Sequence, residues 1–274
     1  MADRSVSTRS SFDVARPSVR EISTADLRAA LRMGIDDFLA MPSHLLFLGL
    51  FYPLFGLVLG ALMFTENGIA LLFPLVAGFA LVGPVLATPF YEASRRRELG
   101  IEPSWREVLE IFSSPAIWSL AVLGILLMII FIAWMVTAQA IYAWIYGARA
   151  PQEVFAFLTD VVTSYRGWSL ILLGHAVGFL FAVAAFTISV VSFPLLVDRD
   201  VGAGVALRTS VDAVLANPGP MALWGLIVAV LLAVGSLPLL VGLTVVMPIL
   251  GHSTWHLYRR AVDRTSVEQT ASRG

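Results

Sequence analysis

Cysteine and charge are the two features that this sequence of 274 residues has least of. Without cysteine, the chain can form no disulfide, no thiolate nucleophile and no thiolate metal site. Charged residues make up 14% of the chain, where a typical soluble domain has about a quarter. The net charge is −1, so no large basic face can be assembled, and nucleic acid is excluded as a partner.

Apolar residues are correspondingly abundant, at 58% of the chain, and the mean hydropathy is +0.84. They gather in runs of roughly the twenty residues that a helix needs to cross the hydrocarbon of a bilayer. The predicted spans are 43–64, 68–91, 116–146, 168–197, 220–236 and 237–259. The last two share one apolar stretch, which we divide at Gly235-Ser236-Leu237-Pro238 because a single helix would overshoot the bilayer. The predicted fold class is therefore an all-α membrane protein, a six-span helical bundle.

Arginine placement predicts the orientation of these spans. With the N-terminus inside, the inner side receives most arginines, including Arg95, Arg96 and Arg97, and the outer side keeps only Arg149 and Arg166. We therefore expect a multi-pass protein of the bacterial inner (plasma) membrane with both termini in the cytoplasm.

The N-terminus does not read as a cleavable signal, because the first long apolar run begins only after Pro42. The first span is expected to act as an uncleaved anchor. Polar tails at 1–22 and 262–274 are predicted to be disordered, and they flank a membrane domain at 23–261.

Short segments with helical apolar spacing lie between the spans, near 27–38, 105–112, 154–165 and 207–215. In the first, one predicted face is apolar: Leu27, Leu31, Ile35 and Phe38. The opposite predicted face is charged: Arg28, Arg32, Asp36 and Asp37. Such segments are too short and too charged to cross the bilayer. Two placements, in the membrane interface or packed on the ends of the spans, stay open.

Part of this pattern repeats within the chain. Residues 30–42 align with 206–218, with seven of thirteen positions identical, and Pro84-Val85-Leu86 aligns with Pro248-Ile249-Leu250. We predict an internal helix–hairpin repeat, with units at about 23–97 and 202–261 and a divergent middle at 98–201. The repeat predicts two exposed ion pairs between residues four apart on one helix: Arg32 with Asp36, and Arg208 with Asp212.

These motifs resemble an uncharacterised family of predicted bacterial integral membrane proteins, domain of unknown function 2189. The resemblance is carried by the Leu-Arg-x-Gly-x-Asp-Asp-Phe helix at 31–38, and by the Pro-x-Leu segment that leads to Tyr91-Glu92-x-x-Arg95-Arg96. It extends from about residue 20 to about residue 260. It implies a multi-pass membrane protein and supplies no activity and no catalytic residue.

Motifs for chemistry are scarce as well. The sequence contains no Gly-x-Ser-x-Gly, no P-loop and no His-Glu-x-x-His, so no enzyme is predicted. The centres of the spans carry essentially no ionisable side chains, which argues against an ion-coupled transporter.

Three histidines are weak candidates for a metal or haem site: His44, His252 and His256. The last two are four residues apart, so they share a helix face near the cytoplasmic end of the sixth span, and His44 lies at a similar depth. The alternative is that the rings lie at the level of the headgroups, as amphipathic rings prefer. We favour the alternative and predict no metal and no cofactor.

Glycines within the spans are predicted to form helix-packing faces or faces for a partner: Gly49, Gly56, Gly60, Gly174 and Gly178. Together with the missing catalytic motifs, they favour a non-enzymatic accessory, assembly or scaffold subunit that binds other membrane proteins. The alternative is a carrier or binder of a lipid or another apolar molecule.

Overall fold

The computed structural model describes residues 17–41, 68–102, 104–147, 154–237 and 240–263. Within these ranges the regular structure is helical, apart from one isolated β-bridge between Val19 and Val262. The first predicted span lies outside the described residues, and four candidate residues lie there with it: His44, Gly49, Gly56 and Gly60.

One set of helices follows the apolar runs. They are α3 (Gly68–Phe79), α4 (Gly83–Glu98), α6 (Ile117–Tyr146), α8 (Tyr165–Ser189), α9 (Ser192–Asp198), α11 (Pro218–Ser236) and α12 (Leu243–Ala261). A single 3-10 turn, η1 (Ala80–Val82), joins α3 to α4. Four stretches of the described residues are long and apolar enough to cross a membrane: Leu72–Glu98, Ile117–Tyr146, Tyr165–Asp198 and Pro218–Ser236. These four coincide with the second to the fifth predicted spans.

The break between the fifth and sixth predicted spans falls where the sequence placed it. Helix α11 ends at Ser236 and α12 begins at Leu243. The two helix ends approach closely at a pair of glycines, since a Cβ atom on Gly242 would lie 2.7 Å from the carbonyl oxygen of Gly235. Helix α12 is not one of the four membrane-spanning stretches, because its second half is polar.

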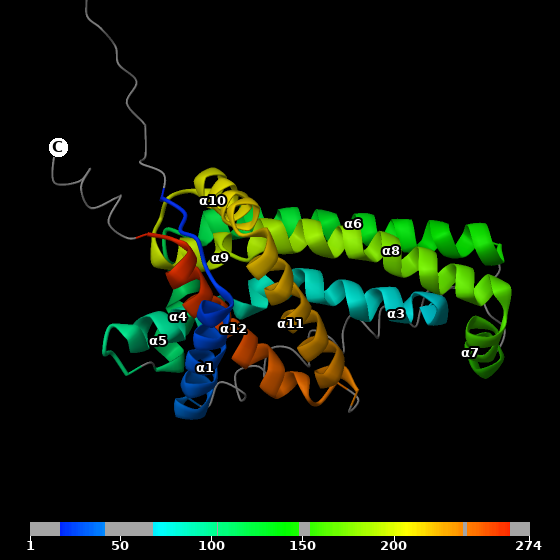
Figure 1. Ribbon diagram of the computed structural model, residues 1–274, viewed down its shortest axis with the longest axis horizontal. Helices are drawn as coiled ribbons and strands as arrows, with labels where there is room; N and C mark the ends of the chain where they lie inside the picture. The colour runs from blue at the N-terminus through cyan, green and yellow to red at the C-terminus, as the bar shows by residue number, and fades with distance from the viewer. Residues whose placement is uncertain (1–16, 42–67, 103, 148–153, 238–239, 264–274) are drawn as a thin grey trace, which may run out of the picture.

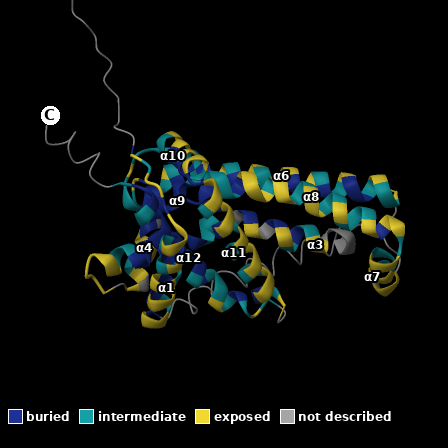
Figure 2. Cartoon of the chain, viewed as in Figure 1, coloured by how far each residue is buried: buried dark blue, intermediate teal, exposed yellow. Residues whose placement is uncertain are grey.

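Helix α6 shows why the apolar stretches need a bilayer. Its thirty residues extend over about 45 Å, and apolar side chains surround it on all sides. Trp118 and Trp144, near its two ends, are each 79% exposed. Helices α6 and α8 lie side by side and, with α3 packed on α6, extend to one side of the molecule, with exposed residues along their outer faces (Figures 1 and 2). Exposed apolar surface of this length is typical of contact with lipid or with another membrane protein.

A second set of helices connects those of the apolar runs: α1 (Thr24–Ala40), α5 (Trp105–Leu109) with the 3-10 turn η2 (Glu110–Ser113), α7 (Val154–Thr163) and α10 (Ala203–Ala216). They coincide with the four segments of helical apolar spacing. Helix α1 begins at a capping box, in which the Ser23 side chain accepts from the Asp26 amide and the Asp26 carboxylate accepts from the Ser23 amide.

The buried face of α1 differs from the predicted apolar face. The buried residues are Leu27, Ala30, Gly34 and Asp37, whereas Ile35 is exposed. Asp37 therefore does not lie on the solvent side, where the charge pattern placed it. The reason is that α1 packs along α12, and the α12 surface offers room for small residues and hydrogen-bond donors for a carboxylate.

One end of the bundle contains most of the buried polar side chains. Helix α1 packs on α12, α10 packs on α9 and α8, and α5 packs on α4, while α4, α9 and α12 also contact one another (Figure 1). We call this end, formed by α1, α4, α9, α10 and α12, the clasp end. Helix α7 lies at the opposite end of the α6–α8 pair.

Candidate functional site

The polar half of α12 is the centre of the clasp end. Every residue from Leu250 to Tyr258 is buried. Helix α1 covers it so closely that a Cβ atom on Gly34 would lie 2.7 Å from the Cα atom of Ser253. On the α4 side, a Cβ atom on Gly251 would lie 2.8 Å from the Cβ atom of Phe90. Two glycines thus let three helices meet at van der Waals distance around a polar segment.

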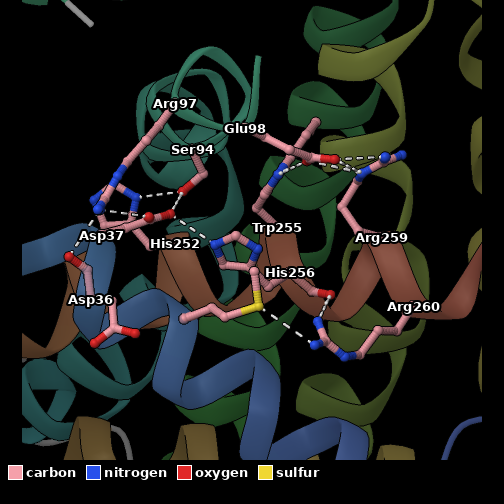
Figure 3. Close-up of polar contacts among 11 residues, drawn as sticks. Asp36, Asp37, Ser94, Arg97, Glu98, His252, Trp255, His256, Arg259 and Arg260 are labelled. Carbon is pink, nitrogen blue, oxygen red and sulfur yellow. Dashed lines mark hydrogen bonds and ion pairs between the residues drawn. The ribbon is translucent and has the colours of Figure 1, made fainter. Parts of the chain in front are cut away.

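The carboxylate of Asp37 joins these three helices (Figure 3). Its Oδ2 atom accepts hydrogen bonds from Ser94 Oγ of α4, at 2.6 Å, and from His256 Nε2 of α12, at 2.8 Å. Its Oδ1 atom accepts from Arg97 Nη1, at 2.9 Å. Arg97 also donates to the main-chain carbonyl of Asp36, at 2.9 Å. A single buried carboxylate is therefore satisfied by donors from two other helices.

These contacts keep Asp37 ionised. Burial raises the pKa of this carboxyl, but the hydrogen bonds from His256 and Ser94 outweigh burial, so the pKa of Asp37 is below its ordinary value. Arg97 matches the negative charge directly. The hydrogen bond between Asp37 and His256 joins the first described helix to the last one, over a separation of 219 residues.

His252 completes the cluster and is fully buried. Its Nδ1 atom lies 2.8 Å from Ser94 Oγ. Because the Ser94 hydroxyl hydrogen goes to Asp37, the proton of this second bond must come from His252 Nδ1. The Nε2 atom is then an acceptor, and it has no hydrogen-bond partner among the described residues. Ser253 Oγ, under Gly34, is likewise buried without a partner in the described part of the chain.

A second polar group lies on the other side of α12. Glu98, at the end of α4, accepts from Trp255 Nε1 at 3.1 Å and from Arg259 Nη2 at 2.8 Å (Figure 3). Asp198, at the end of α9, accepts from the Tyr258 hydroxyl at 2.7 Å. Glu98 and Asp198 are the last residues of their helices, and each accepts a hydrogen bond from α12. These bonds fix the ends of α4 and α9 to α12.

The junction of α10 and α11 holds the N-terminal segment through Asn217, which is only 3% exposed. Its Oδ1 atom accepts from the Ile22 amide at 2.8 Å, and its Nδ2 atom donates to the Arg20 carbonyl at 3.0 Å. Arg20 also pairs with Asp263 at 2.6 Å, beside the bridge between Val19 and Val262. Residues 17–22 and 262–263, predicted to belong to the disordered tails, therefore lie paired together at the clasp end.

Ser94, His252 and Asp37 are the residue types of a hydrolase triad, but they are connected in a different order. In a triad the imidazole joins the nucleophilic hydroxyl to the carboxylate. Here Ser94 lies between the other two, so its hydrogen is held by Asp37 and His252 is no base for it. All three side chains are also buried. The arrangement holds helices together and does not activate a nucleophile.

The described residues contain no group of three histidine, cysteine or carboxylate side chains that could hold a metal ion. The structure does bring His252, His256 and Asp37 together, but the two imidazoles bond to different partners. The third histidine of the metal hypothesis, His44, lies outside the described ranges.

The remaining candidate residues have separate places. Gly178 packs on Trp134 of α6, since a Cβ atom on Gly178 would lie 3.0 Å from the indole ring. A Cβ atom on Gly174 would meet nothing within 4 Å. The four residues of the predicted repeat ion pairs are exposed: Arg32, Asp36, Arg208 and Asp212. No ion pair joins these four described side chains in the structure, so the pairing stays a prediction.

Sequence reasoning did not identify several partners of the buried polar groups. They are Ser94 and Arg97 in the Asp37 cluster, and Asn217 and Tyr258 elsewhere at the clasp end. Part of the signal was visible, because 251–256 reads Gly-His-Ser-Thr-Trp-His inside an otherwise apolar stretch. Polar residues at that depth need partners, which predicts a buried network although it does not identify its members.

Residues 72–198 match a protein family described as a predicted integral membrane protein, DUF2189. The match covers somewhat less than half of the chain, so this region is similar to that family. It contains Arg95, Arg96 and the other residues of the second resemblance motif, and it covers three of the four membrane-spanning stretches. The resemblance seen in the sequence is thus confirmed over 72–198. No curated protein matches the chain, and no solved structure does.

The DUF2189 region and the apolar helices establish an integral membrane protein. Helix α1 and helix α12, which build the Asp37 cluster with α4, lie outside the matched region.

Proposed function

We propose that this integral membrane protein is a non-enzymatic accessory, assembly or scaffold subunit that binds other membrane proteins through its apolar helix surface. The observation that carries the proposal is the open glycine face of α8. Gly174 and Gly178, four residues apart, share a face of α8, and nothing lies within 4 Å of a Cβ atom at Gly174, which leaves space that a partner helix can enter closely. Small residues at such positions are typical of helix–helix contacts in membranes.

The partners of the buried polar groups support the same proposal. At the clasp end, the buried carboxylates and imidazoles bond to other residues of the chain and stabilise its own helices. The long surfaces of α6, α8 and α11 are apolar and exposed. A molecule whose polar chemistry is used internally and whose outer surface is apolar is suited to binding within the bilayer.

A six-span topology with both termini on one side is part of the proposal. The pairing of Arg20 with Asp263 brings the two ends of the described chain together at the clasp end. Helix α3 runs toward the clasp end, α6 away from it, α8 toward it, α11 away and α12 back (Figure 1). A sixth crossing at 43–64 makes the number of crossings even, as paired termini require.

The internal repeat also belongs to the proposal, and the packing of α1 and α10 supports it. The buried positions correspond at the repeat offset: Ala30 with Ala206, Gly34 with Ser210, Asp37 with Ala213, and Met41 with Asn217. Each of the two helices packs on a helix that ends a hairpin, α12 for α1 and α9 for α10, and α5 packs on α4 in the same way. This favours reading the middle, 98–201, as a third, diverged unit.

The test is purification of the full chain from its native membrane in a mild detergent, with quantification of co-purified proteins. Gly174→Leu fills the open space on α8, and Gly219→Leu is the matched control, because that glycine of α11 also has nothing within 4 Å. We expect a stoichiometric membrane partner that Gly174→Leu loses more than tenfold, equivalent to at least about 1.4 kcal/mol of binding, and that Gly219→Leu retains.

Two outcomes would contradict the proposal. A folded protein that purifies alone with bound lipid would favour the lipid-binding alternative. A partner retained by Gly174→Leu would place the contact on another surface. Size-exclusion chromatography of both variants shows whether each is folded.

A further inference from the structure

The α1–α12 contact contains a neutral polar cluster that has no acceptor for an additional proton among the described residues. The carboxylate of Asp37 and the guanidinium of Arg97 cancel each other, so the cluster is neutral while both imidazoles are neutral. The ring of His252 is fully buried, and its Nε2 atom has no partner among the described residues. A proton added at Nε2 would be a buried charge on a donor that has no acceptor in the described part of the chain, and such a group is among the costliest to bury.

The groups that face His252 from each neighbouring helix offset only part of this cost. Asp37 faces it from α1, and Ser94, Arg97 and the main chain of Phe90 face it from α4, while His256 lies one turn further along α12. Asp37 and the Phe90 main chain favour an added proton, whereas burial, His256 and Arg97 oppose it. The only negative charge in the set, on Asp37, is already bonded to Arg97, Ser94 and His256. Arg97 itself repels a second positive charge. His256 differs, because its Nε2–H donates to Asp37 whether or not the ring is charged.

We propose that α1 is a proton-sensitive strap, which stays docked on α12 while His252 is neutral and is released when His252 takes up a proton. This inference goes beyond the proposed function and does not depend on it. An ordinary imidazole takes up a proton near pH ~6.5, so release is expected as the pH falls below that value. The docked state, which disfavours the proton, is stabilised above that pH and weakened below it.

Asp37 cannot produce the same change in that pH range. Its pKa is below its ordinary value in the folded protein, so its contribution to docking is present above about pH 3.9 and is lost only as the pH falls further. A transition between about pH 7 and pH 5 therefore reports on imidazole and not on this carboxylate.

The chain provides its own reference helix. Helix α10 packs on α8 and α9 as α1 packs on α12, but Ala213 occupies the position of Asp37. Its buried polar contact is Ser210 Oγ, which donates to the Thr187 carbonyl at 2.8 Å and accepts from the Val191 amide at 3.1 Å. Neither of these groups titrates, so α10 should be insensitive to pH in the same range.

Hydrogen–deuterium exchange of the full chain in detergent micelles tests the strap, after correction for the pH dependence of intrinsic exchange. Between about pH 7.5 and about pH 5, protection of α1 should fall by on the order of 30-fold, which is a factor of about ten per pH unit below 6.5. Protection of α10 should stay constant. In His252→Asn the side-chain amide keeps the bond to Ser94 and cannot titrate, so the loss of α1 protection should disappear.

Two further variants keep the inference falsifiable if His252→Asn does not fold. In His256→Gln the loss of α1 protection at low pH should persist, because the His252 ring is still present. In Arg97→Gln, which changes a partly exposed side chain, Asp37 can compensate a charged His252 and the loss should become smaller. The strap is overturned if α1 and α10 lose protection together, if folded His252→Asn keeps the full loss, or if Arg97→Gln leaves it unchanged.

Discussion

Gly34 shows how much a single residue decides in this fold. A Cβ atom at this position would lie 2.7 Å from the Cα atom of Ser253, so Gly34→Ala must push α1 away from α12. We expect a loss of about 1–3 kcal/mol in the free energy of unfolding, as for other overpacked sites. The control is Gly204→Ala in α10, where nothing lies within 4 Å and stability should stay equal or rise by up to about 1 kcal/mol. Thermal unfolding of both variants in detergent measures the difference, and equal midpoints would contradict the close contact.

At the same scale, Asp37 marks where a sequence pattern is insufficient. Charge periodicity places Asp36 and Asp37 together on the solvent side, and this is correct for Asp36 alone. An aspartate can be buried only where donors satisfy it, and the donors of Asp37 come from Ser94, Arg97 and His256. They are 57 to 219 residues away in sequence, so no local window contains the information.

At the scale of an element, Asn217 is the buried side chain that helps to hold the segment 17–22, beside main-chain bonds from Arg20 to Ala261 and from Asp263 to Ser18. Asn217→Ala removes the partner of the Arg20 carbonyl and leaves the buried Ile22 amide unsatisfied, which costs about 1–3 kcal/mol. We expect the segment to detach, so trypsin should cleave after Arg20 at least tenfold faster. Asp263→Asn is the control, because it breaks an exposed ion pair worth at most about 1 kcal/mol. Equal cleavage rates in the two variants would show that Asn217 does not hold the segment.

Helices were predictable to the extent that their causes are local. The second to fifth spans follow from the length of apolar sequence that a bilayer requires, and the turn after Ser236 follows from neighbouring glycine, serine and proline. The buried face of α1 was not predictable in this way. Its residues include Ala30 and Gly34, which are too small to appear as an apolar stripe and are buried because α12 fits against them.

For the whole molecule, the two ends of the chain are the least local feature. Asp37 bonds to His256, and Arg20 bonds to Asp263, so the first and last described helices close the clasp end together. A sequence pattern can predict that α1 and α10 are related, but not that α1 packs on the final helix. Closure of this kind makes α1 and α12 one structural unit, which is why a proton on His252 can act on the N-terminal helix.

The orientation of the molecule in the membrane can be tested because the chain has no cysteine, so any cysteine introduced is unique. Thr163, at the end of α7, and Arg106, in α5, are exposed at opposite ends of the bundle. The clasp end contains Arg95, Arg96 and Arg97, and arginine-rich ends face the cytoplasm.

A membrane-impermeant maleimide applied to intact cells should therefore label Thr163→Cys and leave Arg106→Cys unlabelled until the membrane is permeabilised. Labelling of Arg106→Cys alone would invert the orientation. Labelling of both would mean that α6 does not cross the membrane, because α6 is the long helix that separates the two sites in the chain. The expected result, taken with the pairing of Arg20 and Asp263, would place both termini in the cytoplasm and require an even number of crossings.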